Sequence, residues 1–107
     1  MARRAESAQF ELAPAGAEGT YALSGVLSFD TASAALARGT TLFRGAGTRS
    51  VDLSGVTHAD SAGLSVLLTW VERAKREGWR LRYTALPAQL LGIARLCAVE
   101  SLLAAAE

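Results

Sequence analysis

The sequence predicts an α/β fold in which a mixed, mostly parallel β-sheet carries helices mainly on one face. Two observations lead to this prediction. Two short strand patterns flank a turn-rich segment near the N-terminus, which favours an antiparallel hairpin at the edge of the sheet. Strand and helix patterns then alternate along the chain. Because parallel strands need a crossover connection, usually a helix, the alternation indicates two right-handed strand–helix–strand units.

Length and composition fit one small globular domain. Half of the 107 residues are hydrophobic and 20% are charged, which is enough to build a core. We assign residues 1–8 to a flexible N-terminal segment and residues 9–107 to the domain. The formal net charge of +1 provides no overall field to attract nucleic acid or an anionic membrane. No apolar run approaches the ~20 residues that span a bilayer, so we expect no direct membrane insertion.

The single cysteine, Cys97, cannot form an internal disulfide, which favours a reducing compartment. Residues 1–8 contain two arginines but no apolar stretch follows them, so they do not resemble a signal peptide. We therefore expect a cytoplasmic location. We also expect Cys97 to be a small core residue.

The N-terminal hairpin is predicted from strands at Gln9–Leu12 and Thr20–Ser24. Between them, Ala13–Gly19 is rich in alanine and glycine and contains a proline, which is typical of a turn. We expect Gly25 to end the second strand.

The next predicted element is a helix over Ala32–Phe43. Asp30 or Thr31 precedes it, and either side chain can accept from the free amides of a first helical turn. Residues 39–41 are Gly-Thr-Thr, which weakens the helix prediction for the second half.

A short strand at Ser50–Leu53, followed by a loop, leads to the clearest helix, Ala62–Glu77. Gly78 is well placed to end this helix, since glycine adopts the left-handed conformation that terminates many helices. Its apolar residues recur at the spacing of one buried helical face: Leu64, Leu67, Leu68 and Val71.

The remaining elements are a strand, a helix and a short final helix. Trp79–Thr84 alternates apolar and polar residues, which is typical of a strand with one solvent-facing side. Pro87 suits the first turn of a helix over Pro87–Leu96. Val99, Leu102 and Leu103 indicate a last short helix that packs on the body.

The junction before the long helix holds the candidate site. Asp60 and Ser61 stand where a helix presents unpaired amides and the positive end of its dipole, and Ala62 and Gly63 leave the backbone approachable. In one interpretation Asp60 and Ser61 simply cap the helix. In the other, Ser61 is displayed to a partner or to a kinase, whose phosphate would add roughly −2 charge to a neutral surface.

The same junction resembles the signature of STAS domains, the family of sulfate-transporter tails and anti-sigma-factor antagonists. Residues 52–56 read Asp-Leu-Ser-Gly-Val and residues 60–64 read Asp-Ser-Ala-Gly-Leu, at the separation typical of that family. The order of strands and helices also matches, so the resemblance covers about residues 10–103 and implies a STAS-like fold.

Within this family the chain is most similar to MlaB-like proteins, the small STAS subunit of the Mla phospholipid transporter of Gram-negative bacteria. The similarity includes Leu86–Leu96 and the Val99 to Leu103 closure. It implies binding to the ATPase of an ABC transporter, and through it to the membrane permease, in support of phospholipid trafficking and outer-membrane lipid asymmetry. The protein would then lie at the inner membrane through its partner, with Ser61 at the contact.

The resemblance leaves a second function open. MlaB-like proteins often carry threonine at the position of Ser61, whereas anti-sigma-factor antagonists are phosphorylated on serine. The alternative is therefore an antagonist that an anti-sigma-factor kinase binds and phosphorylates on Ser61.

The long helix contains four more candidate residues for the same contact. Val66 and Trp70 are four positions apart and share a helical face, which would suit a partner if exposed, with Thr69 and Arg73 beside them. The alternative is that the buried stripe is wide, that Trp70 packs on the following strand, and that Thr69 and Arg73 are solvated surface.

Neither a catalytic nor a metal site is predicted. His58 is the only histidine and has no second ligand at metal-binding spacing, and Asp52 and Asp60 lack a nucleophile–base pair. The glycines match no phosphate-binding loop. We therefore expect a protein without enzymatic activity, metal or cofactor.

Overall fold

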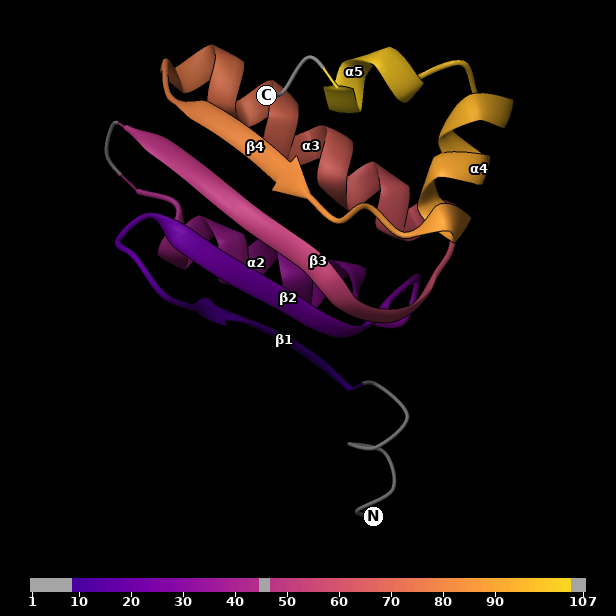
Figure 1. Ribbon diagram of the computed structural model, residues 1–107, viewed down its shortest axis with the longest axis horizontal. Coiled ribbons are helices and arrows are strands. Elements are labelled where there is room, and N and C mark those ends of the chain that lie inside the picture. Colours follow the sequence, from indigo (N-terminus) through magenta and orange to yellow (C-terminus); the bar gives the residue numbers. More distant parts are fainter. Residues whose placement is uncertain (1–8, 45–46, 105–107) are drawn as a thin grey trace.

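The computed structural model describes residues 9–44 and 47–104; the predicted flexible segment 1–8 lies outside them. The described residues form a four-stranded sheet in the order β1-β2-β3-β4 (Figure 1). The elements in chain order are β1 (Phe10–Pro14), β2 (Thr20–Leu27), α2 (Ala32–Leu42), β3 (Thr48–Ala59), α3 (Ser61–Glu77), β4 (Arg80–Thr84), α4 (Ala88–Leu96) and α5 (Glu100–Ala104).

The sheet topology confirms the predicted fold class. β1 pairs with β2 antiparallel, whereas β2 with β3 and β3 with β4 pair parallel. Helices α2 and α3 lie behind the sheet in Figure 1, and α4 and α5 pack against α3. Across the described part of the chain, no helix has the length and apolar character needed to cross a membrane.

Strands β2 and β3 are longer than the sequence predicted. Gly25 does not end β2, because the strand continues to Leu27 and pairs with the second half of β3. Gly25 instead has a φ of +90° and stands beside a shift in the β2–β3 register. A Cβ there would lie 2.8 Å from the carbonyl oxygen of Gln9. Glycine therefore lets the strand bend and continue, and the predicted loop after Leu53 is strand up to Ala59.

Helix α2 extends through the stretch that the sequence marked as weak. Its start is fixed by Thr31, but not by a side-chain cap on the helix: the Thr31 hydroxyl donates to the carbonyl of Val26 and accepts from the amide of Ser28. Gly39 has a packing role, because an added Cβ would lie 2.6 Å from Nε1 of Trp70 on α3. The two helices therefore approach closely at Gly39.

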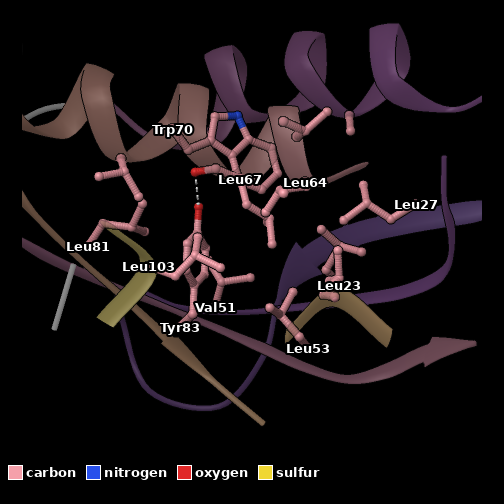
Figure 2. Close-up of a cluster of buried hydrophobic side chains, with 14 of the residues drawn as sticks. Leu23, Leu27, Val51, Leu53, Leu64, Leu67, Trp70, Leu81, Tyr83 and Leu103 are labelled. Carbon is pink, nitrogen blue, oxygen red and sulfur yellow. Dashed lines mark hydrogen bonds between the residues drawn. The ribbon is translucent and has the colours of Figure 1, made fainter. Parts of the chain in front are cut away.

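The core lies between the sheet and helices α2 and α3, and is closed by the C-terminal helices (Figure 2). The hydroxyl of Tyr83 on β4 donates to the carbonyl of Leu67 on α3 at 2.7 Å, and burial raises the pKa of Tyr83. Phe43 meets Trp70 edge-to-face with ring centroids 5.1 Å apart. These contacts fasten both α2 and the sheet to the inner face of α3.

The outer edge of β1 is partly covered by α2. The carbonyl of Gln9 accepts from the amide of Val26, and the amide of Ala15 donates to the carbonyl of Thr20. The backbone N–H and C=O groups of the odd-numbered residues in this segment therefore point to β2. The carbonyl of Leu12 therefore faces the open edge, where Nε of Arg38 donates to it at 2.9 Å.

The C-terminal helices follow the prediction with two corrections. Pro87 is the N-cap of α4 and not part of its first turn. Cys97 is exposed and not a core residue, because it follows the last turn of α4 beside Leu96, which is 88% exposed. Leu103 is buried and holds α5 on the body.

Replacing Gly39 by alanine should lower the free energy of unfolding, because the new Cβ would overlap the buried indole of Trp70. Overpacking of this kind costs about 1–3 kcal/mol. Gly92 in α4 is a matched control, since nothing lies within 4 Å of its added Cβ. Gly92→Ala should raise the same free energy by up to about 1 kcal/mol. Urea denaturation measures both, and equal effects would contradict the packing explanation.

Candidate functional site

The Asp60 carboxylate organises the junction between β3 and α3. Its Oδ1 accepts from the amides of Ala62 and Gly63 at 2.9 and 3.1 Å, which caps the first turn of α3. Its Oδ2 accepts from the amide of Phe29 at 3.2 Å, in the loop between β2 and α2. The predicted capping role of Asp60 is confirmed. The same carboxylate also ties the loop between β2 and α2 to the start of α3.

These contacts set the acidity of Asp60. Desolvation, the largest single effect, raises the pKa of Asp60. The amide hydrogen bonds from Gly63, Phe29 and Ala62, together with the interaction with His58, outweigh desolvation and leave the pKa below its ordinary value of 3.8. The site therefore holds a carboxylate whose hydrogen-bonding capacity is used within the fold.

Gly63 brings the first turn of α3 against the end of β2. A Cβ at Gly63 would lie 2.1 Å from the carbonyl oxygen of Leu27, a distance that no side chain could occupy. The amide of Asp60 also points to this carbonyl, at 3.4 Å. Gly63 therefore fixes the depth at which the helix start sits on the sheet.

Ser61 is exposed at the first position of α3, and its hydroxyl makes no hydrogen bond within the described part of the chain. Two further exposed hydroxyl residues follow at helical spacing, Ser65 and Thr69. Their hydroxyls donate to the carbonyls of Ser61 and Ser65 at 3.2 and 2.8 Å. The outward face of α3 beside Ser61 is therefore short-chained and uncharged.

Phe29 extends this face and was not singled out from the sequence. Its side chain is 81% exposed, although its backbone amide is held by Asp60. The available signal was an aromatic residue in a short turn between a strand and a helix, because loops frequently carry functional residues. We call Phe29, Ser61, Ser65 and Thr69 the junction surface.

The structure corrects the interpretation of Val66 and Trp70 as an exposed pair. Both are 1% exposed and lie in the core. The buried stripe of α3 is wide, as the alternative interpretation held. Trp70 packs against Gly39 and Phe43 of the α2 region. A second helix covers this side of α3, so these two residues cannot meet a partner directly.

Arg73 is not ordinary solvated surface. Its guanidinium donates to the carbonyls of Gly39 and Phe43 at 3.3 and 2.6 Å and pairs with Glu77. Cationic donors at the C-terminal carbonyls of a helix are stabilising. Arg73 therefore fastens the end of α2 to α3.

Asp52 lies within β3, away from the junction. The Asp52 carboxylate accepts from the amide of Ser54, and these hydrogen bonds lower the pKa of Asp52. Within residues 9–44 and 47–104, no group of three His, Cys, Asp or Glu side chains could hold a metal ion.

The family model described as Mlab, STAS domain, matches residues 10–104. No curated protein matches the chain. Among solved structures, the chain resembles the anti-sigma factor antagonist SpoIIAA in its unphosphorylated form, with 19% identity, a TM-score of 0.56 and coverage of 75% of this chain and 76% of that chain. It also resembles a sulfate transporter family protein from Wolinella succinogenes, with 18% identity, a TM-score of 0.64 and coverage of 87% and 75%.

Asp60→Asn should lower the free energy of unfolding by about 1 kcal/mol at neutral pH, because an amide NH₂ cannot accept from the Phe29 amide. Since the folded protein lowers the pKa of Asp60, the carboxylate stabilises the fold above pH 3.8 and this stabilisation is lost as the pH falls through the folded value. The difference between wild type and variant should shrink accordingly in acid.

Chemical denaturation at neutral and acid pH tests this expectation. Asp30→Asn is the control, because the Asp30 side chain makes no hydrogen bond within the described residues. A difference for Asp60→Asn that is independent of pH would contradict the capping role of the carboxylate.

Proposed function

The chain belongs to the STAS domain family in its Mlab branch, and on this premise we propose that it is a non-catalytic subunit that binds the ATPase of an Mla-type ABC transporter. Binding would stabilise and activate the ATPase and so support phospholipid trafficking and outer-membrane lipid asymmetry. The protein would work in the cytoplasm, peripheral to the inner membrane, and would reach the membrane permease only through the ATPase.

The observation that carries the proposal is the exposed Phe29 beside the exposed Ser61. The Phe29 side chain is 81% exposed. When a partner covers such a large aromatic side chain, apolar area is removed from water, and this burial favours binding. Aromatic residues of this kind are frequent hot spots of protein interfaces. Ser61, Ser65 and Thr69 are short, so a partner element could approach the α3 backbone closely beside Phe29.

The rigidity of the junction surface also supports docking. Asp60 hydrogen-bonds both the Phe29 amide and the first turn of α3, so the loop and the helix keep one relative position. Gly63 sets the depth of that turn against Leu27. A preorganised surface loses little conformational entropy when it binds, which favours affinity.

A second candidate function is an anti-sigma-factor antagonist that is switched by phosphorylation of Ser61. The observation that favours it is the exposure of the Ser61 hydroxyl at the start of α3. A phosphate there would meet the favourable helix N-terminus but also the Asp60 carboxylate, and it would charge the centre of an uncharged surface. The partner would then be a kinase, and intact mass measured on protein from its native cells would show a stoichiometric phosphate on Ser61.

Ser61→Glu should weaken binding of the ATPase by about tenfold or more, because a charged side chain would have to be desolvated in the contact. Thermal stability should change little, since a carboxylate in the first turn of a helix is favourable. Co-purification from native cells, with the ABC ATPase identified by mass spectrometry and its ATP hydrolysis measured in the complex, provides the readout. Equal recovery of ATPase with wild type and variant would remove Ser61 from the interface.

Phe29→Ala should reduce recovery of the same ATPase strongly while leaving the melting temperature almost unchanged, because the side chain contributes little to the core. Leu96→Ala is the matched control: Leu96 is an apolar residue with 88% exposure that stands outside the junction surface. If both substitutions reduce recovery equally, the loss reflects general stickiness of apolar side chains and the proposed surface is wrong.

A further inference from the structure

A cavity of about 390 Å³ lies at the end of the sheet opposite Ser61. It is bordered by residues at the start of β2 and at the start of β3, and by Arg44 and Gly47. Its volume is within the range of small-molecule sites, about 300–1,000 Å³. The residues that line it are predominantly polar: Glu18, Gly19, Tyr21, Arg44, Gly47, Thr48 and Arg49.

Two arginines line this cavity, and one of them, Arg49, is buried. Arg49 is only 6% exposed, and its guanidinium lies over the ring of Trp79, 5.4 Å from the centroid. It also donates to the carbonyl of Arg44. A buried guanidinium held by fixed neighbours has little freedom left to lose, so Arg49 presents a positive charge in one position.

Arg44 supplies the second positive charge and is available for a ligand. Its side chain is exposed and makes no hydrogen bond or ion pair within the described residues. Glu18, whose side chain likewise has no partner there, is the one acidic residue of the lining. Because two cations face one anion, the cavity keeps a net positive charge.

Hydroxyl and backbone groups complete the wall. Thr48 lines the cavity, and Tyr21 does so while its hydroxyl donates to the carbonyl of Leu42 at 3.3 Å. Gly19 has a φ of +85° and an added Cβ would lie 2.8 Å from the carbonyl oxygen of Thr48. Glycine therefore keeps the starts of β2 and β3 close, so that residues of both strands share one wall.

We propose that this cavity binds a phosphate monoester. Guanidinium groups hold phosphate through charge-assisted hydrogen bonds, and donors that come from separate segments suit a tetrahedral anion better than a planar carboxylate. The cavity is larger than a phosphate group, and Glu18 and Thr48 can accept hydrogen bonds from hydroxyls on the body of the ester. This site is independent of the ATPase contact, since Thr48 begins the strand whose other end leads to Ser61.

The test is titration of the ¹⁵N-labelled protein with inorganic phosphate and with glycerol 3-phosphate at low, constant ionic strength. We expect saturable shifts of the Gly19, Gly47 and Thr48 amides, with tighter binding of glycerol 3-phosphate. Absence of saturable shifts at these amides would overturn the site. Equal affinity for both ligands would contradict the assignment to an ester.

Three variants sharpen the result. Arg44→Gln should weaken binding about tenfold, because a charge-assisted hydrogen bond to the phosphate is lost. Glu18→Gln should tighten binding, because it removes the one negative charge of the lining. Arg82→Gln, an exposed position on β4 outside the cavity, is the control for loss of net charge. A loss of affinity in Arg82→Gln equal to that in Arg44→Gln would show that the anion is attracted only by the overall charge.

Discussion

The fold depends on the contact between the first turn of α3 and the end of β2. Gly63 lies so close to the Leu27 carbonyl that no side chain fits between them, and Asp60 holds both the helix start and the Phe29 loop. The close approach of Gly63 to Leu27 and the hydrogen bonds of the Asp60 carboxylate thereby hold the helix, the strand and the loop together. The inner face of α3 can then insert Leu67 and Trp70 between the sheet and α2, because the position of the helix is already determined at its first turn.

The inner face of α3 carries buried residues that hold the fold together, and its outer face carries exposed residues. Trp70 and Val66 are buried in the core, and Arg73 holds the end of α2. Ser61, Ser65 and Thr69 are exposed on the outward part of the helix. An outer face of this kind can change in sequence without repacking of the inner face, so one fold can carry different surface sites.

Local chemistry made part of this structure predictable from sequence. The cap at Asp60 and the stop at Gly78 depend on neighbouring backbone groups, and the alternation of elements implied the parallel sheet. The extension of β2 past Gly25 was missed because strand pairing with β3 decides it. The burial of Trp70 depends on where α2 crosses α3, and the exposure of Phe29 depends on the direction of its turn. The periodicity of a single helix predicts neither of them.

The hydrogen bond from Arg38 to Leu12 bears on how the molecule behaves at high concentration. An unpaired outer strand offers a template on which another chain can add, and this is a common start of aggregation. Here the carbonyl at the middle of that strand is already occupied, and Pro14 has no amide proton to give at its end. Growth of the sheet from the β1 side is therefore disfavoured.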